Sequence, residues 1–291
     1  MTGAQPRRLA LLSQLKHTYR KFKRAQRRWL SNSLLPLATF QARLSLKAGK
    51  PLALLIDSSV LGHAVIHETG WISTGTKKWG HHDVDTGYMA RIPVHAPDND
   101  SRTYNEVQYL APIAHLHRTS NIKLVSSAEL FAEQFRQPMG RFRGYGWADY
   151  HAFKGIQFES VDGLHLDMTK PLEAQRERLD SNTAPLFREL VTLLGEKSSQ
   201  DAWHIYTAQK YGLFAFLHID FSLAAKIHQH KNAPVIRNLK TRVLLPSQFA
   251  KLFHILPVKT NLLGSEEDGF FPMRNDLHMP DQRRRNRKDY K

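Results

Sequence analysis

Hydrophobic and polar positions alternate along the chain in two distinct patterns. Short apolar runs bounded by turn residues predict buried strands at 51–58, 122–125, 214–219 and 241–245. Elsewhere apolar positions recur every three or four residues, which predicts helices. The expected helices cover 106–119, 129–135, 185–194, 200–211, 221–229 and 246–253. Strands that alternate with helices predict the α/β class, with a mostly parallel sheet sandwiched by helices.

The N-terminal region predicts two further helices, over 7–30 and 34–48. Apolar side chains of the first helix fall along one stripe, and Lys and Arg fill the remaining positions. The stripe consists of Leu12, Leu15, Tyr19, Phe22 and Trp29. This pair of helices either packs on the body with a solvated basic face or presents that face to phosphates. An acid-free, Arg-rich start also resembles a mitochondrial transit peptide, so we expect a cytoplasmic protein with a mitochondrial location as the alternative.

The charge is concentrated at the two ends of the chain. The net charge is +16, and residues 1–56 contain twelve Lys and Arg but no acid. Residues 281–291 contain six basic and two acidic side chains, whereas residues 57–280 contain equal numbers of both. This distribution predicts a neutral globular body with two basic appendages. Such appendages favour a polyanionic partner, and nucleic acid before a membrane surface.

Length and composition predict one domain with additions. We expect a basic helical extension at 1–50, a domain at 51–258 with an insertion at about 136–198, and a basic, disordered tail at 259–291. Residues 70–104, rich in Gly, His, Asp and Pro, are expected to be irregular. The chain has no apolar run long enough to span a membrane. It has no Cys, which excludes disulfides, thiolate metal sites and Cys nucleophiles.

Four acidic residues lie where strands end or helices begin. Asp57 and Asp220 end two predicted strands, Asp201 opens a predicted helix, and Glu106 lies near the start of another. The carboxyl ends of parallel strands and the adjacent helix N-termini form one crevice in an open α/β sheet. Side chains from these four segments could therefore meet there. Taken singly, each of these acids could equally be an ordinary helix cap.

Four clustered carboxylates repel one another unless cations neutralise them. Oxygen ligands select hard ions, so the expected cofactor is Mg²⁺ or Mn²⁺. Such ions activate water and stabilise the charge of an in-line displacement at phosphorus. The pattern therefore fits hydrolysis of a phosphodiester.

Three segments resemble PIN-domain nucleases. The sequence LLIDSSVL at 54–61 is similar to the opening strand that delivers the first metal-binding Asp in that family. Residues 201–227 resemble the second half of the PIN domain, in which a helix begins with Asp and the following strand ends in Asp. RVLLPSQFAKL at 242–252 resembles the closing strand and helix, and residues 104–135 resemble the helix and strand between the two halves.

The resemblance implies a PIN-like endoribonuclease that cuts single-stranded or structured RNA. It places Asp57, Glu106, Asp201 and Asp220 as catalytic residues that bind Mg²⁺ or Mn²⁺. It gives Ser59 and Ser222 supporting roles, and each hydroxyl could instead serve the start of a helix. RNA is the expected partner, before DNA, together with a homo-oligomer or an inhibitory protein.

Two positions depart from the family pattern and support other interpretations. Ser59 stands where Asn is frequent, and His218 stands where Thr or Ser is commoner. A non-catalytic RNA- or DNA-binding protein on a degenerate PIN-like fold is therefore one alternative. The toxin of a toxin–antitoxin pair is another.

Basic residues in three segments are expected to contact nucleic acid. The segment 140–155 also interleaves cations with aromatic rings, which suits single strands or, equally, a long loop packed on the body. The basic run at 283–288 would add non-specific phosphate affinity, act as a targeting signal, or remain solvated. The expected contacts are Arg20, Lys21, Arg24, Arg27, Arg28, Arg141, Arg143, Arg284 and Arg285.

Overall fold

The computed structural model of this chain has a parallel sheet at its centre. It describes residues 19, 22, 25, 26, 29, 33–46, 49–79, 81–95, 101–137, 150–163 and 171–263. Five strands form the central sheet in the order β6-β4-β1-β7-β8, and every neighbouring pair is parallel. The strands are β1 (Leu52–Ile56), β4 (Ile122–Ser126), β6 (Glu159–Ser160), β7 (Ala215–Leu217) and β8 (Arg242–Leu244). The predicted α/β class with a parallel sheet is therefore confirmed.

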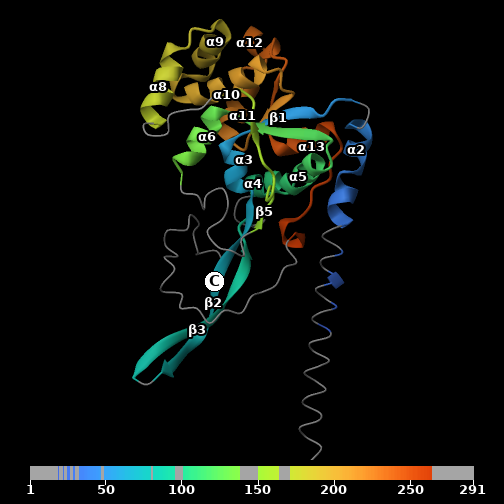
Figure 1. Cartoon of the computed structure of the whole chain (residues 1–291), viewed down its shortest axis with the longest axis vertical. Helices are drawn as coiled ribbons and strands as arrows, with labels where there is room; N and C mark the ends of the chain where they lie inside the picture. Colours follow the sequence, from blue (N-terminus) through green and yellow to red (C-terminus); the bar gives the residue numbers. More distant parts are fainter. Residues whose placement is uncertain are drawn as a thin grey trace, which may run out of the picture.

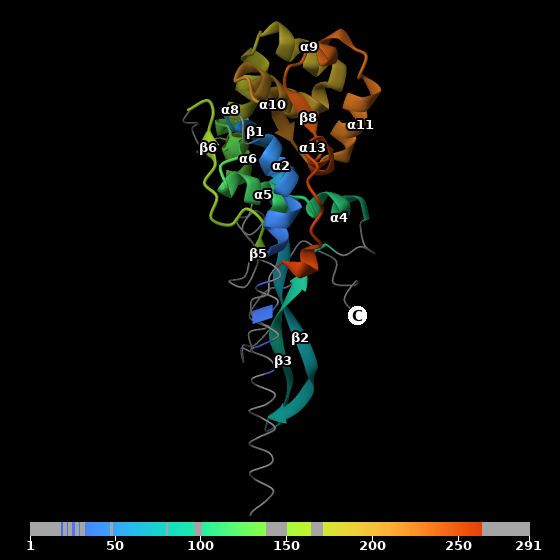
Figure 2. The same cartoon turned by 90° about the vertical axis from the view of Figure 1, so that its right-hand side faces the viewer.

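Helices cover both faces of this sheet (Figures 1 and 2). On the N-terminal side of the chain they are α2 (Phe40–Leu46), α3 (Ser58–His63), α4 (Ser101–Val107), α5 (Leu110–Arg118) and α6 (Ala128–Phe135). Those that follow are α8 (Pro171–Ser181), α9 (Pro185–Leu194), α10 (Ser199–Lys210), α11 (Phe221–Gln229), α12 (Pro234–Arg237) and α13 (Pro246–Leu252). Two short 3₁₀ turns, η1 (Glu196–Ser198) and η2 (Thr260–Leu262), complete the described elements.

The alternation of side chains along each strand divides the interior into two cores. Leu54 and Ile56 of β1 pack into one core with residues of α2, α5 and α13. Leu55, between them, packs into the other core with residues of α6, α9, α10 and α11. Phe216 of β7 joins this second core, whereas its neighbours Ala215 and Leu217 join the first. Burial on both faces explains why these strands are apolar throughout.

A long hairpin occupies most of the segment that was expected to be irregular, and this expectation was wrong. Strands β2 (Val65–Trp79) and β3 (His82–Pro93) pair in an antiparallel register that runs from His67–Pro93 to Trp79–His82. The short strand β5 (Tyr150–His151) pairs with the base of β2. The hairpin projects away from the body in both views (Figures 1 and 2). Its β-branched and aromatic residues favour strands, although they stand among Gly, His and Asp.

The helix predicted over 106–119 is two helices. The first, α4, begins at Ser101, and α5 begins at Leu110 after a break at Gln108 and Tyr109. Glu106 therefore lies in the last turn of α4, not near the start of a helix. The sequence predicted one helix because apolar residues continue at spacings of three and four from α4 into α5.

The region 136–198 contributes to the sheet and to both cores, and its Ala152 and Phe153 are buried in the first core. Within it, β6 pairs with β4, and Val161 N–H donates to Ser126 O. Phe187, Leu190 and Leu194 of α9 are buried in the core beneath α10. The segment is thus joined to the domain by both backbone pairing and apolar packing.

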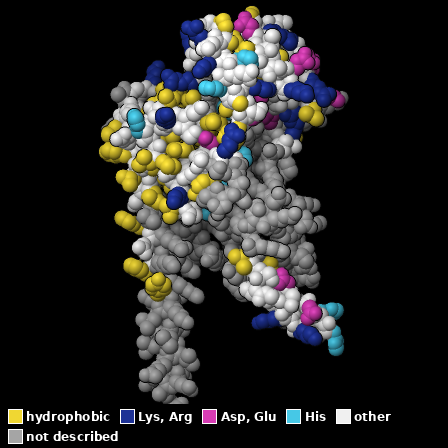
Figure 3. Space-filling view, turned by 180° about the vertical axis from the view of Figure 1, so that it is seen from behind, with side chains coloured by type: hydrophobic (Ala, Val, Ile, Leu, Met, Phe, Trp, Pro, Cys, Tyr) yellow, Lys and Arg dark blue, Asp and Glu magenta, His cyan; other side chains and the backbone are white. Residues whose placement is uncertain are grey.

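The two basic ends of the chain lie mostly outside the described residues, as does the tail beyond 263. In the described part of the N-terminal extension, which includes α2, several apolar side chains are exposed (Figure 3). Leu37, Phe40 and Leu44 are all more than half exposed. Within the described residues, no helix is both long enough and apolar enough to cross a membrane.

The core of the central sheet predicts where truncation destabilises the fold. Leu54 is completely buried, so Leu54→Ala should lower the free energy of unfolding by about 2–5 kcal/mol. Leu172 on α8 is 57% exposed, and Leu172→Ala should change it by less than about 0.5 kcal/mol. Urea unfolding followed by circular dichroism would measure both values. Equal losses in the two variants would contradict the assignment of β1 to the core.

Candidate carboxylate site

Asp57 lies at the C-terminal end of β1 and begins the next helix. It is the N-cap of α3, and its Oδ2 accepts a hydrogen bond from the Ser59 backbone N–H at 3.1 Å. The Ser59 hydroxyl donates to the same oxygen. Burial raises the pKa of Asp57, the positive charge of His204 lowers it, and the negative charge of Glu133 raises it. The net direction is upward, so this carboxylate is held in an environment that disfavours its ionised form.

Ser59 also joins the two central strands at this edge. Its Oγ accepts a hydrogen bond from Ile219 N–H at 2.9 Å, while Asp57 N–H donates to Leu217 O at 3.0 Å. These bonds hold the end of β1 against the segment that follows β7, which carries Asp220. Ser59 thus orients Asp57 and anchors the approach to a second acid.

Asp220 is the N-cap of α11. Its Oδ1 accepts hydrogen bonds from the backbone N–H groups of Ser222, at 2.7 Å, and Leu223, at 3.1 Å. The contact of Ser222 with Asp220 thus runs through its backbone, which is the ordinary capping interaction. These two bonds to Oδ1 fix the Asp220 carboxylate at the sheet edge. Oδ2 takes no part in them.

Asp201 lies in the first turn of α10 and completes a set of three aspartates. Its pKa is raised to about 6, chiefly by burial, with further increases from the charges of Asp57 and Asp220 and an opposing effect of His204. Because the charges of Asp57 and Asp220 both act on Asp201, these two carboxylates lie within electrostatic reach of it. The fold therefore brings together three of the four predicted acids.

Glu106, the fourth predicted acid, is engaged elsewhere. Its two carboxylate oxygens accept hydrogen bonds from Ser247 at the start of α13, one from the backbone N–H at 2.8 Å and one from the hydroxyl at 2.7 Å. It is not among the groups that most perturb the pKa values of Asp57 and Asp201. The structure thus assigns Glu106 to the junction of α4 and α13, which corrects the predicted grouping.

Glu133 and His204 are the members of the site that the sequence analysis missed. Glu133 lies on α6 and His204 on α10, one turn after Asp201. His204 Nε2 lies 2.6 Å from Glu133 Oε1, and both side chains are buried. Within the described residues, Asp57, Glu133 and His204 form the group whose ligand atoms all lie within 4.8 Å of one another. His204 follows Asp201 by three residues, which places both on one face of a helix. This spacing was the one signal in the sequence that could have indicated His204.

The pair carries opposite charges. Burial alone would lower the pKa of His204, but the charge and hydrogen bond of Glu133, followed by Asp57 and Asp201, raise it to about 9. Burial alone would raise the pKa of Glu133, but His204, Gln200 and Ser58 lower it. Both directions agree on an imidazolium–carboxylate pair. This pair places a fixed positive charge beside Asp57 and Asp201.

His218 lies beside the site without sharing its charge. Its Nδ1 accepts a hydrogen bond from Asp220 N–H at 3.2 Å, and its ring stacks on Phe216. Burial lowers the pKa of His218 to about 4, so it is neutral at physiological pH. His218 therefore supports the strand end mechanically, whereas His204 contributes charge.

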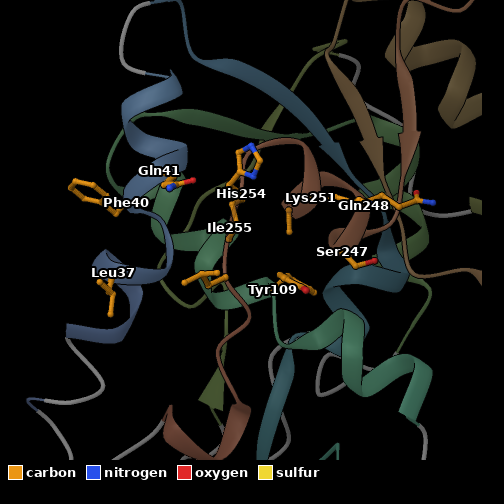
Figure 4. A pocket seen from close by; sticks show the side chains of 11 residues that line it. Leu37, Phe40, Gln41, Tyr109, Ser247, Gln248, Lys251, His254 and Ile255 are labelled. Carbon is orange, nitrogen blue, oxygen red and sulfur yellow. The ribbon is translucent and has the colours of Figure 1, made fainter.

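A separate cavity of about 660 Å³ lies between α2 and α13 (Figure 4). Its lining is largely apolar and includes no acidic residue. It is formed by Leu37, Phe40, Gln41, Tyr109, Ser247, Gln248, Ala250, Lys251, His254, Ile255 and Leu256. The carboxylate site therefore does not lie in this cavity.

The predicted nucleic-acid contacts lie outside the described residues. This applies to Arg20, Lys21, Arg24, Arg27, Arg28, Arg141, Arg143, Arg284 and Arg285. No family model matches the chain, and no curated protein or solved structure is detectably similar to it. The function must therefore be argued from the geometry of the site itself.

The His204–Glu133 pair predicts a specific dependence of stability on pH. The pKa of His204 is about 9 in the folded protein against an ordinary 6.5, so its protonation stabilises the fold. This contribution is complete below about pH 6 and should be lost between pH 6.5 and 9, by on the order of 1–3 kcal/mol. Urea unfolding across that range would measure it.

Glutamine has no titratable group, so His204→Gln should flatten the dependence of the free energy of unfolding on pH between 6.5 and 9. The exposed His82 offers a matched control, because His82→Gln should leave the wild-type profile unchanged. A wild-type profile that is already flat between pH 6.5 and 9 would contradict the charged pair.

Proposed function

We propose that this protein is a metal-dependent endoribonuclease of PIN-like fold, and that Asp57, Asp201 and Asp220 form its active site. The observation that carries the proposal is the convergence of these acids from three separate segments at one edge of a parallel sheet. Ser59 donates to Asp57 and accepts from the N–H of Ile219, the residue before Asp220. The charges of Asp57 and Asp220 both raise the pKa of Asp201. The carboxyl edge of such a sheet is the usual place of an α/β active site.

The donor set fits a hard divalent cation. The charges of Asp57 and Asp220 raise the pKa of Asp201, and a cation placed beside these carboxylates would offset that repulsion. Oxygen ligands favour Mg²⁺ or Mn²⁺, and Mg²⁺ commonly retains several water ligands and only one or two carboxylates. Asp57, Asp201 and Asp220 would hold the ion directly or through water. When bound, the ion would supply Lewis acidity and lower the pKa of water.

The protein's own groups would orient the water and receive its proton. Asp201, whose pKa is about 6, is suited to accept a proton from the attacking water near neutral pH. Asp57 is held in place by Ser59, and Asp220 is held by the N-terminus of α11. The fixed cation at His204 limits the negative charge that an approaching phosphate would meet.

The charge distribution favours a polyanionic substrate. The acidic edge belongs to a body with equal numbers of acids and bases, and the excess positive charge lies at the chain's ends. Basic ends would hold phosphates while the carboxylates hold the ion. RNA is the proposed substrate because the segments around Asp57 and Asp201 resemble PIN nucleases. A non-catalytic nucleic-acid-binding protein on the same fold is the second candidate, favoured by Ser59 and His218, where the family usually has other residues.

Asp57→Asn should abolish cleavage and preserve RNA binding. The substitution removes a charge from the site, so we expect metal-dependent cleavage of a labelled single-stranded RNA to fall about 100-fold or more. Binding, measured by fluorescence anisotropy, should remain within about twofold, because the basic ends are unchanged. Cleavage should require Mn²⁺ or Mg²⁺ and stop with EDTA.

Asp180→Asn is the matched control, since Asp180 is exposed on α8. It should cleave at the wild-type rate. Full activity of Asp57→Asn would overturn the proposed mechanism. If neither the wild type nor Asp57→Asn cleaves, while binding weakens as salt rises, the non-catalytic candidate gains the support instead.

A further inference from the structure

The helix α2 and the helical turn before it pack on the body through small side chains. Ala38 and Ala42 are buried in the first core. The large apolar side chains of the same segment point away from that core and are more than half exposed, namely Leu37, Phe40 and Leu44. A helix that served its own core alone would bury the large apolar residues and expose the others. The outward side of α2 therefore remains largely uncovered by the described residues.

The uncovered side continues toward the N-terminus. Tyr19, Phe22 and Trp29 are helical, and their side chains are 64%, 67% and 68% exposed. Nearer α2, Thr39 N–H donates to Leu35 O at 3.1 Å, which is a helical bond that leads into α2. Counted at 3.6 residues per turn, the six exposed apolar residues fall within one sector of about 80°. This outer face consists of Tyr19, Phe22, Trp29, Leu37, Phe40 and Leu44.

The apolar surface extends from the outer face onto the body. Figure 3 shows hydrophobic side chains that run from the extension onto the adjoining side of the body. Leu37 and Phe40 line one side of the cavity between α2 and α13, and the exposed Leu256 lines it as well. Lys251 lines this cavity, whereas no acidic residue does. A contiguous apolar patch of this kind, bordered by positive charge, marks an interaction surface.

The charge of the extension indicates the chemistry of the partner. Residues 1–56 contain twelve Lys and Arg and no acid, and seven of these cations lie between positions 16 and 28. An anionic lipid bilayer matches both features of the extension. Its headgroups attract Lys and Arg, and the boundary of its acyl chains accepts Trp, Phe and Leu.

Other partners match only one of the two features. A second copy of the chain would cover the apolar residues, but it would place two acid-free basic segments side by side, where like charges repel. A nucleic acid would pair with the cations and could stack on the rings, but it would leave the aliphatic Leu37 and Leu44 uncovered. The basic run at 283–288 contains no apolar residue and is therefore the better match to nucleic acid alone.

We propose that the N-terminal extension docks on an anionic lipid bilayer as an amphipathic helix that lies in the membrane interface. The outer face would lie at the boundary of the acyl chains, and the Lys and Arg residues would contact headgroup phosphates. Tyr19 and Trp29 are of the residue types that favour this interface. Because Ala38 and Ala42 join the helix to the first core, docking would hold the whole domain at the membrane. The inference goes beyond the proposed nuclease and does not depend on it.

Cosedimentation of the full-length protein with lipid vesicles tests the proposal. The wild type should bind vesicles made of phosphatidylcholine and phosphatidylglycerol in equal parts, and should bind pure phosphatidylcholine at least about tenfold more weakly. Anionic vesicles should also shift the tryptophan emission to shorter wavelengths. Trp29→Phe should bind equally well but lose most of that shift. A wild type that does not bind the anionic vesicles, or a shift that survives in Trp29→Phe, would overturn the proposal.

A triple variant separates the apolar contact from simple charge attraction. Phe22→Ser, Phe40→Ser and Leu44→Ser together keep every cation and remove half of the outer face. This variant should bind anionic vesicles at least about tenfold more weakly, while its affinity for single-stranded RNA stays within about twofold. The three side chains are exposed, so their loss should leave the fold intact. If the variant does not fold, the emission of Trp29→Phe still decides the proposal.

Phe135→Ser with Leu172→Ser is the matched control. Phe135 on α6 and Leu172 on α8 are 63% and 57% exposed, similar to the outer face. Their helices pack on the other face of the sheet from α2. This control should bind vesicles as the wild type does, and an equal loss of binding in the control would overturn the assignment of the outer face.

Each alternative partner gives a different result. Equal vesicle binding by the triple variant and the wild type would reduce the interaction to charge alone. A loss of RNA affinity in the triple variant, with vesicle binding unchanged, would assign the outer face to RNA. A wild-type dimer that binds no vesicles and dissociates in the triple variant, measured by light scattering, would assign it to a second copy. All three results would overturn the proposal. Vesicle binding requires neither metal nor cleavage, so its failure would leave the proposed nuclease unaffected.

Discussion

The buried ion pair between Glu133 and His204 makes the rest of the site possible. Burial raises the pKa values of Asp57 and Asp201; the charge of Glu133 raises that of Asp57 further, and the charges of Asp57 and Asp220 raise that of Asp201 further. A buried charge is tolerated only where an opposite charge or several hydrogen bonds offset its desolvation. The imidazolium supplies that charge, and Ser58 and Gln200 supply the bonds. Without His204, the carboxylates of Asp57, Glu133 and Asp201 would lose the cation that acts on all three.

The parallel sheet gives this pair its surroundings. Because β1 lies between β4 and β7, the strand that delivers Asp57 is flanked by the segments that lead to Glu133 and Asp220. The helix α10 crosses the same face and brings Asp201 and His204 one turn apart. Packing and chemistry therefore share the same elements, since Phe216 supports the His204 ring while it fills the core. Substitutions in this core should disturb the site through the position of α10.

Local patterns were sufficient for four of the five strands of the sheet, all but β6, and for most of its helices. Apolar runs located β1, β4, β7 and β8, and Gly212, with φ of 63°, ends α10 where the sequence places it. The β2–β3 hairpin was missed because its strand-forming residues are mixed with turn formers, and pairing across twelve positions decided the outcome. Its exposed strands also lack the apolar alternation that marks a half-buried strand.

By itself, the sequence determined the α/β class, the neutral body with basic ends, and the three aspartates at strand ends and a helix start. These follow from periodicity and from the edge at which parallel strands finish. Only the tertiary structure decided that Glu106 binds Ser247 and that Glu133 and His204 meet across 71 positions of chain. Such contacts depend on how helices are set against the sheet. Spacing along a sequence carries no information about which of two acids a distant donor will reach.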